Sequence, residues 1–301
     1  MRQGKYPFVI GFLLAPVLLY SVFVLWPIFG AAQVSTMNWS GLSPKRDFVG
    51  LDNFSKLLAD DKVWLAAKHH IFLLVTLPVI TIALALFFAF LLNMGGGTRG
   101  GVMTGVWGSK FYRVVFFLPQ VLAVVIVGVI FGRVYAPDGS GILNRFLHLF
   151  GVTDVYWMAD YGMWAILGVL VWQAVGFYVV LFAAGMSSIP GEIYEAAVMD
   201  GASRVTIFFR VTIPMLKETV KVAWVYLGIL AMDAFALVMV LTIDQGGPDG
   251  ATSVLPVQIY QAGILKSQYG YASALGVALA VFTIIFAVLS LRGGKRDAIE
   301  H

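Results

Sequence analysis

The sequence predicts an all-α membrane protein with six transmembrane helices, and its composition and apolar runs both point to this fold class. Hydrophobic residues make up 60% of the 301 residues and charged residues 12%, whereas soluble domains have about 25% charged residues. The mean hydropathy is +0.88. With so few charges, a soluble fold could not cover this much apolar surface, so we expect most of that surface to lie in a membrane.

Six apolar runs are long enough to cross about 30 Å of hydrocarbon. They are 8–32, 69–93, 114–135, 162–188, 221–243 and 272–292. The first run is too long for a signal peptide and contains two prolines, so we interpret it as a retained span. The runs divide the chain into 1–68, with the first span and first outer loop, 69–292, the membrane core, and 293–301, a cytoplasmic tail.

The basic residues predict the orientation, because Lys and Arg collect in cytoplasmic loops. With the N-terminus in the cytoplasm, about 12 of the 20 basic residues fall on the cytoplasmic side and about seven on the outer side. We therefore expect both termini inside the cell. This asymmetry also explains the net charge of +4 without any nucleic-acid partner.

A charged, amphipathic segment, Glu195 to Pro214, lies between two long apolar runs. Pro190 and the two glutamates after it are typical of a helix start, since carboxylates favour the positive end of the helix dipole. Asp200 and Gly201 predict a break, and the residues from 202 to 210 predict a second helix. The segment is therefore predicted to be a helix–turn–helix rather than a simple connecting loop.

This segment resembles the cytoplasmic EAA loop of bacterial binding-protein-dependent ABC importer permeases. The family pattern is EAA, three residues, Gly, nine residues and Ile-x-Leu-Pro. The matching residues are Glu195, Ala196, Ala197, Gly201, Val211, Ile213 and Pro214, with Val for Ile and Ile for Leu. The resemblance implies the type I importer permease fold, with its coupling loop at 189–217. It also implies that the following residues contact an ATPase: Glu192, Glu195, Ala196, Ala197, Asp200, Gly201 and Ala202.

The last outer loop, 244–271, contains a second motif. Its residues are Gly246-Gly247-Pro248, Thr252, Ile259-Tyr260 and Gly270-Tyr271-Ala272-Ser273. Sugar-importer permeases have these elements in this order, so the resemblance narrows the family to carbohydrate uptake. The opening sequence RQGKYPFVIGFLLAP is similar to actinobacterial amino-sugar and chito-oligosaccharide permeases. The first outer loop, 33–68, contains Gly-Leu-Asp-Asn-Phe at 50–54 and is expected to form short interfacial helices.

The fourth span contains an unusually polar and aromatic group of residues. They are Trp172, Gln173, Gly176, Phe177 and Tyr178. Sugars present apolar C–H faces and hydroxyl edges, which suit an aromatic plane with amide or phenol partners. Gln173 and Phe177 share a helix face, and Gly176 would let a pyranose approach the backbone. We expect this group to line the sugar path. The alternative is that Trp172 and Tyr178 only pack or anchor the helix at the interface.

Asp233 lies near the middle of the fifth span. An ionised carboxylate there costs about 2.5–3.5 kcal/mol on insertion scales, so it should face the bundle or a wet cavity. Two interpretations stay open. Asp233 is either a structural carboxylate bonded to a neighbouring helix or subunit, or an acceptor for sugar hydroxyls on the path.

Several kinds of site are not predicted. The chain has no cysteine, which excludes disulfides and thiolate metal sites. It has no GxxxxGK[ST] motif to hold ATP phosphates, and no HExxH motif or carboxylate cluster near its histidines. We therefore expect no catalysis, metal or cofactor in this chain, and ATP and Mg²⁺ would be bound by a partner ATPase.

The resemblance implies a multi-pass subunit of the bacterial plasma membrane that translocates a sugar into the cytoplasm. Its expected partners are a second, related permease, an ATPase dimer inside and a solute-binding protein outside. The alternative class is a secondary carrier or membrane-embedded enzyme that uses Asp233. A carrier with inverted repeats would show similarity between its halves, and an enzyme would show clustered titratable groups; neither is evident in the sequence.

Overall fold

The computed structural model describes residues 5–94, 96, 98–99, 102–103, 105–137 and 139–292; the expected tail, 293–301, lies outside them. This part of the chain is mostly helical, with two short antiparallel hairpins. The predicted all-α fold class is confirmed. Two compact units form: the described residues up to Trp64 with Leu255–Phe282, and Leu65–Val254 with the described residues from Thr283 onward.

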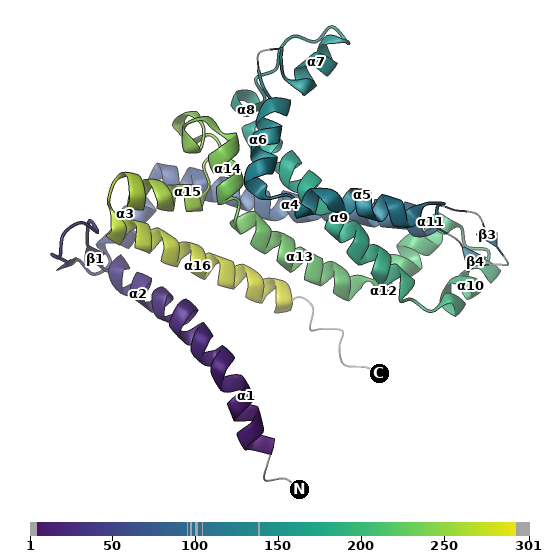
Figure 1. Ribbon diagram of the computed structural model, residues 1–301, viewed down its shortest axis with the longest axis horizontal. Coiled ribbons are helices and arrows are strands. Elements are labelled where there is room, and N and C mark those ends of the chain that lie inside the picture. Colours follow the sequence, from purple (N-terminus) through teal and green to yellow (C-terminus); the bar gives the residue numbers. More distant parts are fainter. Residues whose placement is uncertain are drawn as a thin grey trace. The chain divides into compact units, whose positions relative to one another are not determined.

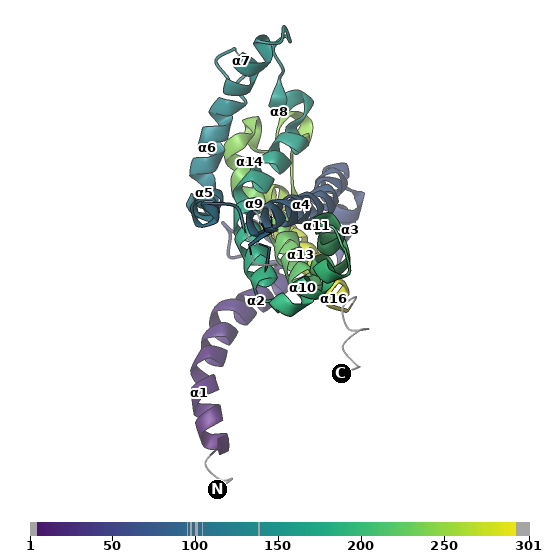
Figure 2. The ribbon, with the colours of Figure 1, turned by 90° about the vertical axis from the view of Figure 1, so that its right-hand side faces the viewer.

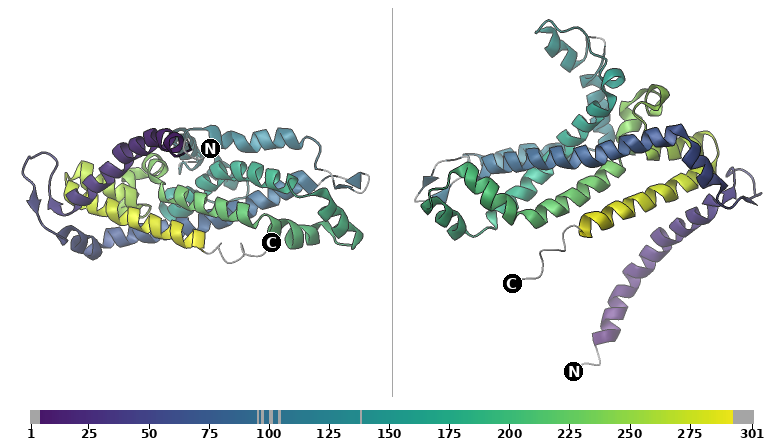
Figure 3. Two further views of the ribbon diagram at one scale, coloured as in Figure 1. Left: turned by 90° about the horizontal axis from the view of Figure 1, so that it is seen from below. Right: turned by 180° about the vertical axis from the view of Figure 1, so that it is seen from behind.

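The first unit begins with one long helix. A π-helical turn, Ser21–Leu25, joins α1 (Lys5–Tyr20) to α2 (Trp26–Ser35) without interrupting the helical path (Figure 3). The most apolar stretch within Gly11–Ser35 has 0% of its residues buried inside the protein. Its side chains are therefore available to lipid or to another subunit.

Shorter elements complete the first unit. They are β1 (Met37–Asn38), β2 (Asp47–Phe48), α3 (Asp52–Ala59), α15 (Leu255–Tyr260) and α16 (Tyr269–Arg292) as far as Phe282. The two strands pair with Met37 opposite Phe48. Buried Asn53 donates through Nδ2 to the carbonyls of Ser35 and Met37, both at 2.9 Å. The outer loop 33–68 thus contains one short helix, α3, where more than one was expected; α3 is tied to the end of α2, and the loop also has a hairpin that was not predicted.

The second unit contains most of the remaining helices. Its first half comprises α4 (Asp61–Met94, here from Leu65), β3 (Thr98–Arg99), β4 (Val102–Met103), α5 (Ser109–Val121), α6 (Val124–Val134), α7 (Ile142–His148), α8 (Trp157–Asp160) and α9 (Gly162–Ser187). Its second half comprises α10 (Gly191–Met199), α11 (Arg204–Ile207), α12 (Ile213–Met215), α13 (Lys217–Met232) and α14 (Phe235–Leu241).

The apolar helices agree with the predicted number of spans. Among the described residues, four helices are long and apolar enough to cross a membrane: Gly11–Ser35, Asp61–Asn93, Gly162–Ser187 and Tyr269–Arg292. Two bent helix pairs, α5 with α6 and α13 with α14, raise the number to six when each pair is counted as one span. These helices correspond to the six apolar runs of the sequence.

The third and fifth expected spans, 114–135 and 221–243, differ from the prediction because neither is a continuous helix. The axes of α5 and α6 meet at 97°, and those of α13 and α14 meet at 48°. Hydropathy could not reveal these bends, because a broken helix and a straight helix can have the same apolar composition.

Local backbone conformation accounts for the two breaks. Leu122 and Ala123 both have extended backbone with ψ of 135°, and Pro119 in the last turn of α5 lacks the N–H that would continue the helix ladder. At the second break, Asp233 has φ −102° and ψ 34°. No proline or glycine lies at this second break, so the local sequence gives no signal for it.

Small residues permit close helix contacts in the second unit. After their breaks, α6 and α14 run side by side and away from α5 and α13 (Figures 1 and 2). A Cβ on Gly128 of α6 would approach Cγ1 of Val240 to 2.9 Å. A Cβ on Gly176 of α9 would overlap the carbonyl oxygen of Phe116 in α5. In a membrane the hydrophobic effect does not drive helices together, because lipid tails are as apolar as the side chains. Van der Waals packing at such close backbone contacts is therefore a main source of stability.

Replacement of Gly176 by alanine should therefore destabilise the α5–α9 contact. Overpacking costs about 1–3 kcal/mol, so Gly176→Ala should lower the Tm of the purified protein in detergent. Gly132→Ala is the matched control, because a Cβ there meets nothing within 4 Å and alanine favours the helix by up to about 1 kcal/mol. Equal Tm values for the two variants would show that the glycine contact does not stabilise the fold.

Candidate functional site

Helix α10 forms the first arm of the predicted helix–turn–helix. It begins after Pro190, and Gly201 ends it with a φ of +78°, which few non-glycine residues adopt. The Gly201 N–H donates to the Val198 carbonyl at 2.9 Å, and the Ala202 N–H donates to the Ala197 carbonyl at 3.0 Å. These two bonds form a Schellman motif. The predicted break at Asp200-Gly201 is confirmed, and its cause is a glycine cap.

One face of α10 is exposed along its length. Glu192, Glu195, Ala196 and Met199 are all exposed, with Met199 at 86%, and their spacing of three, four and seven residues places them on one side of the helix. Met199 was missed as a site residue, although helical periodicity from Glu192 could have identified it. We call these four residues the α10 face. A helix that exposes both carboxylates and a large thioether is suited to contact another protein.

The other predicted coupling residues lie next to this face. Asp200 and Gly201 are exposed, whereas Ala197 and Ala202 are half-buried. β4 contacts α10, and both lie at the same end of the second unit (Figure 1). The predicted set is therefore contiguous along α10 and its cap.

The second arm anchors α10 to the membrane helices. Ser203 Oγ accepts from the Thr206 N–H at 3.2 Å and caps α11. A π-helical turn follows, in which buried Phe208 stacks on Phe90 of α4 with ring centres 4.6 Å apart. Arg204 Nη1 donates to the carbonyl of Gly96 at 2.6 Å. These contacts hold the second arm against α4 and the residues that follow it.

The first helix break is stabilised by α9. Gln173 Nε2 donates to the Leu122 carbonyl at 3.1 Å, between the end of α5 and the start of α6. In hydrocarbon an unsatisfied backbone carbonyl costs several kcal/mol. Gln173 therefore has a structural role at the break in addition to the path role predicted for it.

The second helix break places Asp233 at a gap between α13 and α14. The His70 ring of α4 is hydrogen-bonded to the backbone of Met232, directly before the break. The Asp233 side chain is exposed, and its carboxylate has no hydrogen-bond or ion-pair partner among the described residues. Within the described chain, the interpretation of Asp233 as a carboxylate bonded to a neighbouring helix is therefore not supported.

A cavity of about 190 Å³ lies where the two breaks meet. Its polar lining residues are Gln120 of α5, Gln173 of α9 and Asp233. The other residues that line it are Val124, Leu170, Ala174, Leu230, Ala234, Phe235, Ala236 and Leu237. We call this space the break cavity. Asp233 is the one titratable side chain among these lining residues. Ligand pockets are typically about 300–1,000 Å³, so in this conformation the break cavity could hold no more than a small part of an oligosaccharide.

The structure brings together two of the six predicted path residues, Gln173 and Asp233, at the break cavity. Trp172 and Phe177 are 40% and 41% exposed, and the Phe177 ring packs edge-on against that of buried Tyr178 with ring centres 5.1 Å apart. The space beside Gly176 contains the Phe116 carbonyl, so it makes room for α5 rather than for a pyranose. Sequence reasoning missed Gln120, whose signal is an isolated amide after Pro119 in an apolar run.

Comparison with known proteins agrees with this architecture. Residues 65–292 match the family of binding-protein-dependent transport system inner membrane components. This chain belongs to that family. It is therefore a multi-pass transport permease, and the predicted resemblance is confirmed.

Individual relatives extend over nearly the whole chain. The diacetylchitobiose uptake system permease protein of Streptomyces coelicolor is 39% identical over 94% of this chain and 80% of its own length. The multiple sugar-binding transport system permease protein of Streptococcus mutans is 32% identical, with coverage of 95% and 94%. Among solved structures, a bacterial alginate ABC transporter in complex with an alginate pentasaccharide-bound periplasmic protein has a chain with a TM-score of 0.80 at 21% identity. It covers 97% of this chain and 95% of that one, and confirms the predicted importer permease fold.

Loss of the Gln173 amide should destabilise the protein at the first helix break, between α5 and α6. Gln173→Leu removes the donor of the half-buried Leu122 carbonyl, and loss of one hydrogen bond costs about 0.5–1.5 kcal/mol, so the Tm in detergent should fall. Gln120→Leu is the matched control, because Gln120 lines the same cavity and has no hydrogen-bond partner among the described residues. A Tm for Gln173→Leu equal to that of Gln120→Leu would contradict this structural role.

Proposed function

We propose that this permease translocates a saccharide into the cytoplasm and that ATP hydrolysis on a separate ATPase subunit drives it. The exposed α10 face supports the proposal best, since it presents carboxylates and a methionine on a capped helix that the second arm holds against α4. That arrangement suits a helix that follows the movement of a partner protein. ATP and Mg²⁺ would be bound by that partner.

The substrate we propose is an amino sugar or a chito-oligosaccharide. The 39% identity to the diacetylchitobiose permease extends over almost all of the chain. The opening sequence is also similar to amino-sugar and chito-oligosaccharide permeases. The two amides and one carboxylate of the break cavity can exchange hydrogen bonds with hydroxyl and acetamido groups. Asp233, open to the cavity, would accept from the sugar.

The proposed assembly contains a second permease, an ATPase dimer and a solute-binding protein. The related alginate transporter was solved with its periplasmic protein, which supports the last of these. In the orientation that the basic residues predict, both termini and α10 face the cytoplasm, and the solute-binding protein approaches the opposite side. Selectivity among sugars would then be divided between the binding protein and the break cavity.

The contacts of the second unit suggest how movement at α10 reaches the cavity. Buried Leu216 connects α12 to α13, and a Cβ on Gly185 of α9 would approach Cδ2 of Leu216 to 2.7 Å. Displacement of α10 and its arm would therefore press on both α9 and α13. These two helices carry Gln173 and Asp233 to the two breaks. A shift between them would change the size of the break cavity.

Reconstitution tests the function directly. The permease pair, its ATPase and its binding protein in proteoliposomes should accumulate labelled diacetylchitobiose only when ATP is present inside. Omission of either the ATPase or the binding protein should abolish uptake. Uptake driven by an ion gradient without ATP would instead support a secondary carrier and overturn the proposal.

A change at the cap of α10 tests the coupling role. Gly201→Val imposes about 1–2 kcal/mol of strain at a left-handed position, a factor of about 5–30 in the population of the correctly capped helix. Sugar-stimulated ATPase activity and uptake should both fall several-fold, while membrane insertion stays normal.

Gly191→Val is the matched control for this coupling test. It makes the same chemical change at the start of α10, where φ is not positive and no atom lies within 4 Å of an added Cβ. Normal coupling in Gly201→Val would remove the capped end of α10 from the ATPase contact. Equal losses in both variants would mean that the effect is not specific to the cap.

A further inference from the structure

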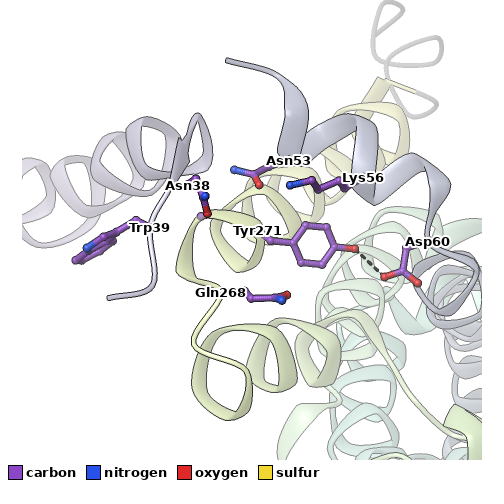
Figure 4. Close-up of a pocket in the computed structure, with 8 residues that line it drawn as sticks. Asn38, Trp39, Asn53, Lys56, Asp60, Gln268 and Tyr271 are labelled. Atoms are coloured by element: carbon purple, nitrogen blue, oxygen red, sulfur yellow. Dashed lines mark hydrogen bonds between the residues drawn. The ribbon is translucent and has the colours of Figure 1, made fainter. Parts of the chain in front are cut away.

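The first unit contains a polar pocket of about 280 Å³ outside the break cavity. It is lined by Asn38, Trp39, Asn53, Lys56, Asp60, Gln268, Gly270 and Tyr271. In Figure 4 the Tyr271 ring lies at its centre, with Lys56 and Gln268 on opposite sides and Asp60 at its hydroxyl end. We call this the Tyr271 pocket. It joins two sequence motifs with no previous role, the Gly-Leu-Asp-Asn-Phe stretch at 50–54 and the Gly-Tyr-Ala-Ser stretch at 270–273.

Contacts to the backbone carbonyls of Met37 and Trp39 fix the walls of the Tyr271 pocket. The Gly270 N–H donates to the Trp39 carbonyl at 3.2 Å. A Cβ on Gly270 would overlap the Met37 carbonyl, so only glycine allows this approach. Asn53 holds the same carbonyl of Met37 at 2.9 Å. A ligand would therefore meet a preformed pocket and would not have to order the segment around Trp39.

Some polar groups of the pocket already have hydrogen-bond partners within the protein, and others do not. Asp60 Oδ2 accepts from the Tyr271 hydroxyl at 2.9 Å, and Asp60 Oδ1 accepts from the Lys62 N–H at 2.9 Å. The side chains of Asn38, Lys56 and Gln268 are exposed and have no hydrogen-bond or ion-pair partner in the described part of the chain. They supply two amides and one ammonium group to the pocket.

Trp39 lines the edge of the pocket, but its indole has other partners. Its Nε1 donates to the Ser43 carbonyl at 2.7 Å, and the Arg46 guanidinium lies 4.3 Å from its ring centre. Figure 4 shows the indole directed away from Tyr271. Tyr271 is therefore the aromatic surface that a ligand would meet.

Charge balance and shape indicate the ligand class. One ammonium, from Lys56, and one carboxylate, from Asp60, line the same space, so the formal charges cancel and no net charge selects an anion or a cation. Two free amides offer both donors and acceptors, beside one aromatic ring. A neutral polyol ring has alternating hydroxyl donors and acceptors and an apolar C–H face, which match these groups. The volume of about 280 Å³ is below that of most drug-sized pockets, which fits a single sugar ring.

We propose that the Tyr271 pocket is a second saccharide site of this permease, one that binds a single terminal sugar ring outside the break cavity. The inference rests on the proposed function, since the orientation of the chain places the 33–68 and 244–271 loops on the outer side. The pocket would hold the end of an oligosaccharide as it leaves the binding protein. Tyr271 supports one face of the ring, and the Asn38 and Gln268 amides bind its hydroxyls.

Direct binding measurements test this site. The purified complex of both permeases with the ATPase, in nanodiscs and without the binding protein, is titrated with diacetylchitobiose by saturation-transfer NMR. Gln268→Ala and Asn38→Ala should each weaken binding by about two- to twelvefold, the effect of one lost neutral hydrogen bond. Both side chains are exposed, so neither change should affect folding. Lys62→Met is the control, because this exposed lysine is near the pocket in sequence but does not line it.

The outcomes separate this inference from the proposed function. Weaker binding in the two pocket variants, with normal binding in Lys62→Met, supports the site. Three results would contradict the second saccharide site and leave the proposed function intact. They are wild-type binding in the pocket variants, equal weakening of binding in Lys62→Met, and no sugar bound by a complex that transports normally. Pocket variants that lose docking of the binding protein but still bind sugar would identify a protein contact and also overturn the saccharide site. Failure of the wild-type complex to transport any sugar would instead contradict the proposed function.

Discussion

The hydrogen bond from Gln173 to the Leu122 carbonyl is the contact on which the centre of this permease depends. Broken helices are unusual inside a bilayer because the freed backbone groups find no water there. The α9 amide supplies a donor for the first break, and the His70 ring supplies a partner for the backbone at the second. With these partners, α5 and α13 can end partway along their spans. α6 and α14 can then turn together as one packed pair, and the space at the turn becomes the break cavity.

The two units use their polar contacts differently. On the side of α10, polar contacts fix an arm: a serine cap, a glycine cap and one arginine bond to a backbone carbonyl. On the side of the Tyr271 pocket, Asn53 and Gly270 fix a wall and leave three polar side chains free. Under the proposed function, a firmly held α10 suits contact with an ATPase, and a preformed polar pocket suits contact with a sugar. Both sets of contacts use few charged groups, in keeping with a chain that has 12% charged residues.

Much of the helix–turn–helix around α10 could be predicted from the sequence, because its signals are local. These signals are a proline before the helix, a glycine after it and an acidic residue in its first turn, and each acts within a few residues. The bounds of α10 and its glycine cap agree with them. The surroundings of the polar-aromatic group in the fourth span were predicted less well. Gly176 and Phe177 belong to a polar-aromatic group in the sequence, but α5 fills the space beside Gly176, and Phe177 packs against neighbouring rings. Which side of α9 faces a cavity is set by its neighbours, and hydropathy in an almost uniformly apolar helix does not record it.

The sequence by itself determined the number of apolar spans, the helix–turn–helix and the family, since these depend on composition and on residues close in the chain. Only the tertiary structure decided that two spans are broken, that Gln173 and Asp233 share a cavity with Gln120, and that the motifs at 50–54 and 270–273 form one pocket. The physical reason is that helix continuity in a membrane depends on whether a distant side chain can satisfy the freed backbone. For Leu122 that side chain lies 51 residues away along the chain, and for the Asp60–Tyr271 bond the separation is 211 residues. No local pattern specifies such contacts.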